Sequence, residues 1–171
     1  ISFGEFGPYE KVVGRAHGEA DPNHRLNIDI INLDKAPRNA AGLVEYSVDF
    51  CVLKPVDMSK SNRRLLYDAP NRGDKLALVD LNESVKGLGS NELNSAEDAG
   101  NGFLMRQGYV IAFSAWDGGV APGVGYVEDA QGHVLADFPV ATDDGAPIVE
   151  TCREEIVFAH TQSPGRSPLA Y

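Results

Sequence analysis

The pattern of hydrophobic and polar residues is most regular between Val44 and Leu53, where the two kinds of side chain alternate. A repeat of two residues is the period of a β-strand with one buried face. Pro55 follows and removes a backbone donor, so it ends this strand. The same alternation predicts a half-buried strand over Leu26–Leu33, and an apolar run predicts a third strand over Tyr9–Ala16.

One main helix is predicted over Ala96–Gln107. Ser95 and Asp98 stand three residues apart, as the first and last residues of a capping box do. Gly100 and Gly102 lower the intrinsic helix propensity of this segment. We therefore expect tertiary packing to hold the helix in place.

The helix is part of a strand–turn–helix–strand unit. The short apolar run Leu65–Asp68 precedes the turn sequence Pro70-Asn71-Arg72-Gly73, and Tyr109–Trp116 follows the helix. Proline and glycine favour a sharp change of direction directly after the first strand. The last run is apolar on both faces, which is typical of a central strand that is covered on both sides.

The chain changes character after Trp116, where turn signals become frequent. Gln131-Gly132 predicts a hairpin between Gly125–Ala130 and His133–Val140. Asp143-Asp144-Gly145 predicts another turn. A further strand is expected within residues 148–158, before a stretch rich in proline and serine that ends at Tyr171.

Composition excludes several classes of protein. Hydrophobic residues make up 43% and charged residues 23% of the 171 residues, which is typical of a globular domain. The formal net charge of −10 repels phosphate backbones, so nucleic acid is not an expected partner. No apolar run approaches the ~20 residues that span a bilayer, so no membrane partner is expected. Because the chain begins with Ile1, we expect a processed or trimmed start without a targeting segment, which leaves the compartment open.

Metal-binding residues and cysteines do not occur in a diagnostic spacing. His17, Glu19 and His24 are ligand types close in sequence, but a solvated strand end accounts for them better than a metal does. Cys51 and Cys152 fit either two buried free thiols or one long-range disulfide. We predict no metal and no cofactor.

A serine nucleophile is not found in the expected setting. No serine lies in the G-x-S-x-G elbow that presents the nucleophile in many hydrolases. Ser163 comes nearest, but Pro164 follows it, and the residue after the nucleophile must donate its backbone N–H to the oxyanion. Ser114 lies within a predicted strand, where a structural role is expected. We therefore assign no catalytic residue in this chain.

Five segments resemble, in order, the N-terminal region of a family of large bacterial α/β-hydrolase domain proteins: Gly7–Pro22, Leu33–Ala40, Val44–Phe50, Leu65–Gly73 and Gly100–Tyr109. The resemblance implies a serine-type carboxylic-ester hydrolase whose serine, acid and histidine lie downstream of these residues. It implies a predominantly β fragment of a partial α/β-hydrolase core. Residues 1–116 would hold the N-terminal strands and the front of the core. Residues 117–171 would be a β-rich insertion that is truncated at its C-terminal end.

The resemblance also implies where the active site would lie. In such enzymes the strand before the first core helix ends in a loop whose backbone N–H forms half of the oxyanion hole. Here that loop is Asn71-Arg72-Gly73, because Pro70 has no N–H, and Trp116 becomes a neighbour of the site. The implied partners are a small ester substrate and a second polypeptide, or the remainder of the enzyme, carrying the nucleophile. Because half a core exposes apolar sheet edges, an oligomer is also expected.

The alternative is a non-catalytic β-rich binding or assembly module, because short strands and many turns also suit a β-sandwich. Its ligand face would use aromatic residues, namely Tyr109, Trp116, Tyr126 and Phe138. The two hypotheses differ in the position of residues 109–116. This segment is a central parallel strand in the hydrolase and an antiparallel edge strand in the binding module.

Overall fold

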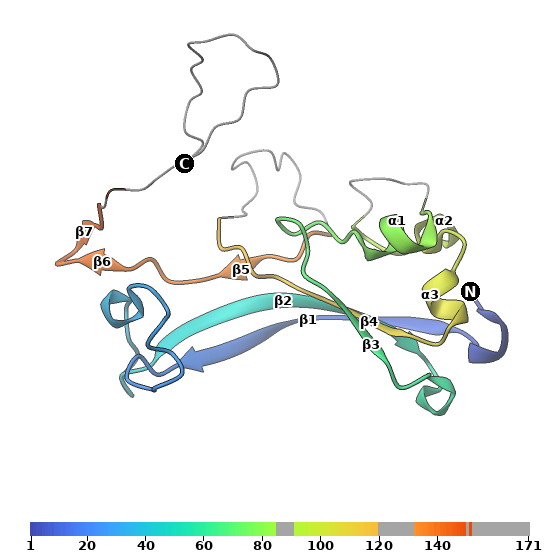
Figure 1. Cartoon of the computed structure of the whole chain (residues 1–171), viewed down its shortest axis with the longest axis horizontal. Coiled ribbons are helices and arrows are strands. Elements are labelled where there is room, and N and C mark those ends of the chain that lie inside the picture. Colours follow the sequence, from blue (N-terminus) through green and yellow to red (C-terminus); the bar gives the residue numbers. More distant parts are fainter. Residues whose placement is uncertain (85–90, 120–131, 150, 152–171) are drawn as a thin grey trace, which may run out of the picture.

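The computed structural model describes residues 1–84, 91–119, 132–149 and 151. Most of these residues build or cover one mixed β-sheet (Figure 1). Its strands are β1 (Tyr9–Ala20), β2 (Val44–Pro55), β3 (Leu65–Asp68), β4 (Val110–Ser114) and β5 (Ala136–Asp137). The strand order is β1-β2-β4-β3, and β5 pairs with β2. The protein is therefore β-rich, as the sequence predicts.

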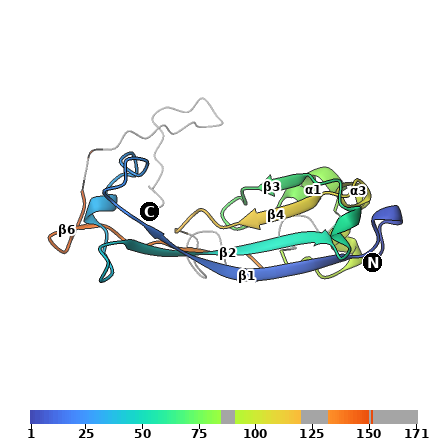
Figure 2. The ribbon, with the colours of Figure 1, turned by 90° about the horizontal axis from the view of Figure 1, so that it is seen from below.

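β1 and β2 form a long antiparallel hairpin that runs along the whole sheet (Figure 2). Pairing is continuous from Tyr9 opposite Pro55 to Ala20 opposite Val44. The predicted strand over Tyr9–Ala16 thus continues four residues further. The predicted orientation of β2 is wrong near its start, where Ser47 is buried and Tyr46 is exposed, and burial alternates only from Cys51 to Pro55.

Two glycines of β1 lie opposite aromatic residues of β2. Gly14 pairs with Phe50 and Gly18 pairs with Tyr46. A Cβ atom on Gly14 would lie 2.9 Å from the Phe50 ring, and one on Gly18 would lie 2.3 Å from the Tyr46 ring. Glycine at these two positions lets each ring extend across β1.

β4 lies inside the sheet, antiparallel to β2 and parallel to β3. Ile111 and Phe113 are fully buried, whereas Val110, Ala112 and Ser114 on the opposite face are half-buried. The prediction of a central strand is confirmed. The predicted cover on both faces is wrong for the described residues, because the helices lie on one side of the sheet only (Figure 1).

The helices on this side are α1 (Ala77–Asn82), α2 (Ala96–Ala99) and α3 (Phe103–Arg106). A short 3-10 helix, η1 (Gly4–Phe6), precedes β1, and two more lie in the connections on either side of β2, namely η2 (Leu33–Lys35) and η3 (Met58–Lys60). All three α-helices belong to the connection between β3 and β4. This connection is therefore a helical crossover between two parallel strands.

The single helix predicted over residues 96–107 is wrong, because the segment breaks into α2 and α3. Gly100 and Gly102 separate the two helices and adopt φ angles of 57° and 70°, which a helix interior does not allow. A Cβ atom on Gly100 would lie 2.2 Å from the carbonyl O of Asn82. The predicted capping box is confirmed, since Ser95 and Asp98 hydrogen-bond each other's backbone N–H.

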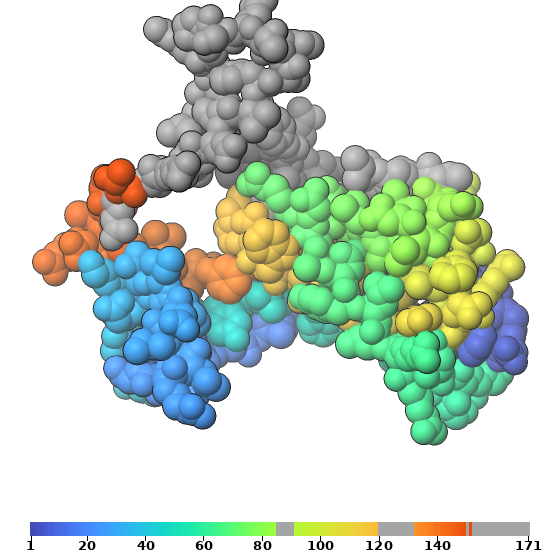
Figure 3. Space-filling view, in the orientation of Figure 1, coloured from blue at the N-terminus to red at the C-terminus, as the bar shows by residue number. Residues whose placement is uncertain are grey.

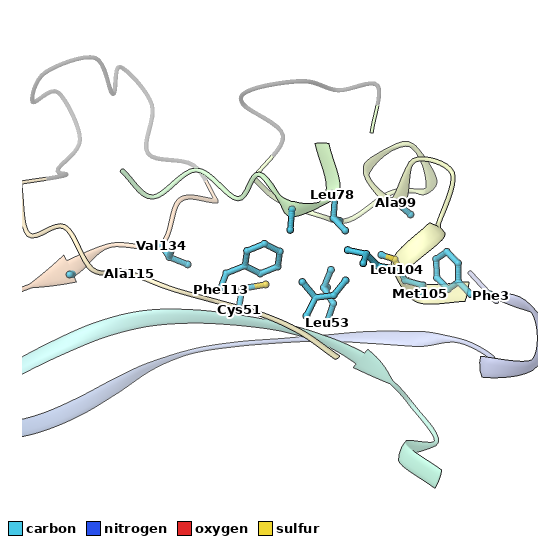
Figure 4. Close-up of a cluster of buried hydrophobic side chains, with 13 residues drawn as sticks. Phe3, Cys51, Leu53, Leu78, Ala99, Leu104, Met105, Phe113, Ala115 and Val134 are labelled. Carbon is cyan, nitrogen blue, oxygen red and sulfur yellow. The ribbon is translucent and has the colours of Figure 1, made fainter. Parts of the chain in front are cut away.

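The hydrophobic core lies between the helices and the sheet (Figure 4). Cys51, Leu53, Ile111 and Phe113 rise from β2 and β4, and residues from all three α-helices pack against them. Val134 joins the same cluster, so a segment beyond residue 116 contributes to this core. Within the described ranges, little covers the opposite face, where Val12, Leu65 and Tyr67 are exposed by 38%, 61% and 56%.

The strand predicted over Leu26–Leu33 is wrong. Residues 21–33 form consecutive turns, in which backbone hydrogen bonds link residues three apart from Asp21 to Leu33. Leu26 and Ile28 are 71% and 78% exposed. The alternating apolar residues therefore do not form a buried face. Residues 21–43 form a lobe at one end of the hairpin, away from the helices (Figure 3).

The turn predicted at Asp143-Asp144-Gly145 is confirmed. It joins β6 (Thr142–Asp143) to β7 (Ala146–Pro147), which form a two-stranded sheet. β5 lies within the predicted strand over His133–Val140. The other arm of the predicted hairpin at Gln131-Gly132, and most of the strand predicted within residues 148–158, lie outside the described residues.

Candidate functional site

The sequence-predicted turn lies at the carboxyl end of β3 and leads into α1. Asp68 is the last residue of β3, and its Oδ2 accepts hydrogen bonds from the N–H of Leu76 at 3.0 Å and of Ala77 at 2.8 Å. These N–H groups belong to the start of α1, where a carboxylate is favourable. Asp68 therefore fixes the distance between the end of the strand and the start of the helix.

Residues 71–74 form a tight turn within this connection. The N–H of Asn71 donates to the carbonyl O of Asp74 at 3.0 Å, and the N–H of Asp74 donates back to Asn71 at 3.1 Å. The central residues Arg72 and Gly73 have φ angles of 53° and 95°. Positive φ at both central positions is the pattern of a type I′ turn.

The three backbone N–H groups predicted to bind an oxyanion, those of Asn71, Arg72 and Gly73, differ in whether the turn already uses them. The N–H of Asn71 is used within the turn. Among the described residues, no acceptor is hydrogen-bonded to the N–H of Arg72 or of Gly73. Successive N–H groups in such turns form concavities that bind anions. The geometry therefore offers Arg72 and Gly73 as donors, and Asn71 closes the turn.

Trp116 lies beside this turn although 46 residues separate it from Pro70. Its Nε1 donates to the carbonyl O of Pro70 at 2.6 Å, while 56% of the residue remains exposed. A second link joins Arg72 Nε to Asp117 Oδ2 at 3.5 Å. The parallel pairing of β3 and β4 brings these strand ends together. The structure thus joins the turn and Trp116, which the sequence singled out separately.

His133 packs against the turn at residues 71–74, and the sequence did not predict this contact. Its Nε2 lies 2.9 Å from Asp74 Oδ1, and its side chain is only 10% exposed. Asn91 Nδ2 donates to the same Asp74 oxygen at 2.7 Å. The N–H of Val134 donates to the carbonyl O of Gly73 at 3.2 Å. A lone histidine in an irregular segment has no motif around it, so no local signal predicts this role.

The space next to Gly73 is filled by the same segment. A Cβ atom on Gly73 would lie 3.0 Å from the carbonyl O of Val134 and 3.1 Å from the His133 ring. Glycine is therefore needed here for its φ angle and for close packing. His133 Nδ1 is buried and has no hydrogen-bond partner among the described residues.

Lys75 follows the turn and is 94% buried, since its exposed fraction is 6%. Its Nζ donates to the carbonyl O of Asn91 at 2.8 Å and also contacts the carbonyl O of Gly132. Burial lowers the pKa of this amine. Lys75 and His133 line a hollow of about 380 Å³ over β1 and β2.

Asp49 and Cys51 line the same hollow from β2. Burial alone would raise the pKa of Asp49, but hydrogen bonds from Arg15 Nε at 2.7 Å and from the N–H of Leu135 lower it below the usual value. Burial raises the pKa of the Cys51 thiol. Cys51 is a buried free thiol, as one of the two sequence hypotheses expects, and Cys152 lies outside the described residues.

The three residues weighed as metal ligands in the sequence do not form a metal-binding group. His17 and Glu19 project from β1, Glu19 accepts a hydrogen bond from Asn39 at 2.7 Å, and His24 Nδ1 accepts the N–H of Leu26. Across the described ranges, no group of three or more His, Cys, Asp or Glu residues could hold a metal ion.

Ser114 is the last residue of β4, within the strand predicted from the sequence. Its Oγ lies 2.7 Å from the hydroxyl of Tyr67. This pair lies on the bare face of the sheet, because Tyr67 and Ser114 alternate with residues that face the core. Ser163, the other serine considered, lies outside the described residues.

A second, more apolar hollow of about 430 Å³ lies at the other end of the hairpin. Tyr46 of β2 and Phe138 line it, with ring centroids 5.9 Å apart. Ile30, Ile31 and Leu33 of the turn segment form another wall. Of the aromatic residues considered for a binding face, Phe138 alone lines this hollow, and Tyr126 lies outside the described residues.

Comparisons with known proteins give no match to a family model, a curated protein or a solved structure. None of the helices formed by the described residues has the length and apolarity needed to cross a bilayer. Any functional assignment therefore depends on the geometry at the ends of β3 and β4.

Proposed function

We propose that this chain is the N-terminal, oxyanion-side portion of a serine-type carboxylic-ester hydrolase. The observation that carries the proposal is the turn at the carboxyl end of β3, where Arg72 and Gly73 present two adjacent N–H groups beside Trp116. In open α/β sheets, ligands bind outside the carboxyl ends of the strands. The nucleophile, the acid and the catalytic histidine would come from polypeptide outside these residues.

The arrangement of the sheet supports this proposal. β2 is antiparallel to both of its long neighbours, and a helical crossover joins β3 to the parallel strand β4. A strand, a helical crossover and a parallel strand form the βαβ unit from which open α/β sheets are built. The central position of β4, with a parallel neighbour, is also what distinguishes the hydrolase hypothesis from the binding module.

The proposed chemistry is acyl transfer. A serine attacks the ester carbonyl, the alcohol leaves, and water hydrolyses the acyl-enzyme. The N–H groups of Arg72 and Gly73 would bind the negative oxygen that develops at the carbonyl. Such donors stabilise the transition state most when they are fixed beforehand, and the hydrogen bonds around residues 71–74 provide this rigidity.

The bare face of the sheet supports the need for a further polypeptide. Leu65 and Tyr67 of the terminal strand β3 are 61% and 56% exposed. Strands in parallel arrangements are normally covered on both faces. A second polypeptide, or the remainder of the enzyme, would cover this face and supply the nucleophile.

The test is to purify the chain natively from the organism that makes it and to assay 4-nitrophenyl butyrate hydrolysis. We expect the chain to be joined or bound to polypeptide with a serine that a fluorophosphonate probe labels. The 171-residue chain alone should neither hydrolyse the ester nor react with the probe. Probe-sensitive activity of the isolated chain would overturn the proposal, as would a native assembly without a reactive serine.

The non-catalytic binding module is favoured by one observation, the apolar hollow of about 430 Å³ at the end of the hairpin. Such hollows hold apolar small molecules. A solvatochromic dye such as Nile red should then bind the chain, and Phe138→Asp should abolish binding. Val149→Asp should not, because Val149 is exposed and does not line the hollow. Equal dye binding by both variants would remove this support.

A further inference from the structure

We infer that the turn at residues 71–74 and the adjacent indole of Trp116 bind a planar carboxylate, so that the preferred ester has an acyl group that is both flat and anionic. The inference deepens the proposed function by naming the substrate class of the same site. Its meaning for catalysis rests on the proposed function, but carboxylate binding by this chain can be measured without any esterase activity.

The first observation is the presence of arginine at a position that disfavours it. Arg72 occupies the first central position of a type I′ turn, with φ of 53°. Glycine, asparagine and aspartate are the residues that suit this conformation. A non-glycine residue held at positive φ is a sign of functional constraint when the surrounding structure enforces it. Here the closing hydrogen bonds between Asn71 and Asp74 enforce it.

The second observation is the state of the Arg72 guanidinium. The side chain is 56% exposed, and its ion-pair partner among the described residues is Asp117, at 3.5 Å from Nε. This distance is longer than a good charge-assisted hydrogen bond. A guanidinium has five N–H donors in a planar fork. Most of that fork remains available for a carboxylate from a ligand.

The third observation is the indole of Trp116. Its Nε1 is fixed on the carbonyl O of Pro70 at 2.6 Å, yet the residue is 56% exposed. The hydrogen bond holds the ring at the base of the turn that carries Arg72. Large aromatic rings that are exposed and yet anchored provide flat contact area for planar ligands.

Together these groups match a flat acid in both charge and shape. The indole contacts the ring of the ligand, and the guanidinium pairs with its carboxylate. Asp117 lies on the Arg72 guanidinium and immediately follows Trp116 in the chain. It therefore orients the cation and competes with the ligand for it.

The test uses the single tryptophan of the chain as its own reporter. Benzoate, a planar anion, is titrated into the 171-residue chain while tryptophan fluorescence is followed. Benzamide, its neutral analogue, is titrated in parallel, and N-acetyltryptophanamide gives the correction for collisional quenching. We expect a saturable change with benzoate and a dissociation constant ~2–5-fold higher for benzamide, the size of one exposed charge contact.

Three variants make the result specific. Arg72→Gln should weaken benzoate binding ~2–5-fold. Arg25→Gln, which removes the same charge from an exposed position in the hairpin connection, should leave it unchanged. Asp117→Asn should tighten binding, because it removes the competing carboxylate. Opposite effects of two neighbouring substitutions would not arise from a general loss of structure. Equal binding of benzoate and benzamide, or equal effects of the two arginine variants, would overturn the inference.

The same variants separate this inference from the proposed function. In the native assembly, mono-(4-nitrophenyl) terephthalate should be preferred over 4-nitrophenyl benzoate, and Arg72→Gln should remove the preference in kcat/KM. Benzoate binding without any esterase activity would support the carboxylate site and contradict the proposed hydrolase function. Esterase activity without an Arg72-dependent preference for the anionic ester would support the proposed hydrolase function and overturn the inferred substrate class.

Discussion

His133 Nε2 lies 2.9 Å from Asp74 Oδ1, and this contact joins the segment around residue 133 to the turn at the end of β3. Asn91 donates to the same carboxylate oxygen, so two distant segments converge on the last residue of the turn. The two N–H groups proposed to bind the oxyanion precede Asp74 directly. Their orientation therefore depends on residues far away in the sequence.

Replacing His133 by alanine should loosen the turn and lower the free energy of unfolding by about 1–2 kcal/mol, because a largely buried contact to a carboxylate is lost. Urea unfolding measures this difference. His17→Ala is the matched control, because His17 is exposed on β1, and it should change stability by less than about 0.5 kcal/mol. Equal effects of the two substitutions would show that the contact between His133 and Asp74 contributes nothing.

Gly100→Ala should be among the most damaging single substitutions outside the core strands. The new Cβ atom would lie 2.2 Å from the carbonyl O of Asn82, at a residue whose φ is 57°. We expect a loss of at least ~3 kcal/mol in unfolding free energy, from overpacking together with an unfavourable backbone conformation. Asn82 is itself fully buried and hydrogen-bonded to Leu104, so the backbone there has little room to move.

Gly145→Ala is the control for the conformational part of this cost. Gly145 has φ of 82°, and no atom lies within 4 Å of a Cβ placed there. Gly145→Ala should lower the free energy of unfolding by about 1–2 kcal/mol, which is the effect of the left-handed conformation alone. Thermal unfolding of both variants separates the two contributions, and a Gly100→Ala variant no less stable than Gly145→Ala would contradict the close approach.

Local signals in the sequence predict the parts of the fold that depend on neighbours in the chain. The strand over Val44–Leu53 and the capping box of Ser95 and Asp98 both appear in the structure, but burial alternates in this strand only from Cys51 onward. The alternation over Leu26–Leu33 led to a wrong strand prediction, because here the same pattern occurs in consecutive turns whose apolar residues are exposed. The period of a pattern does not reveal whether a partner strand exists.

The site is less predictable because it depends on contacts between distant segments. The sequence indicates a sharp turn at residues 70–73, and it separately marks Trp116 at the end of a buried strand. Only the register of β3 against β4 brings these two together. His133 carries no sequence signal at all, since its partner Asp74 is known only once the chain has folded. The sequence also does not show which N–H groups of residues 71–73 are free to bind a ligand. This depends on the hydrogen bond from Asn71 to Asp74 that closes the turn.

The buried amine of Lys75 should make stability depend on pH in the alkaline range. Its folded-state pKa is lowered by burial from the ordinary value of 10.5. Between the lowered pKa and 10.5 the unfolded chain binds more protons than the folded one, so the contribution of this group to stability rises with pH. Above 10.5 the contribution is constant.

The Lys75→Met variant isolates this effect. The difference in unfolding free energy between the wild type and the variant should grow from pH 7 to pH 10 in favour of the wild type. Tyr9 does not interfere, because its pKa is raised to about 12, so its own contribution is lost only as pH rises from about 10 to about 12. A difference between the two proteins that stays constant with pH would mean that Lys75 titrates in the folded state as it does in the unfolded chain.

The bare face of the sheet leads to a prediction about association. Leu65 lies on the terminal strand β3 and is 61% exposed, next to apolar positions of β4 on the same face. An apolar face at the free edge of a sheet promotes pairing with another chain. We therefore expect the isolated 171-residue chain to self-associate at micromolar concentration, measured by size-exclusion chromatography with light scattering.

Leu65→Lys should shift this association towards the monomer by ~10-fold in Kd, because a charge at an edge strand opposes pairing. Val149→Lys adds the same charge at an apolar residue that is 86% exposed and lies outside the main sheet, so it should have no effect. If both variants dissociate equally, the net charge rather than the sheet face controls association. If the wild-type chain is already monomeric, the bare face does not attract a second chain, and the case for a covering polypeptide weakens with it.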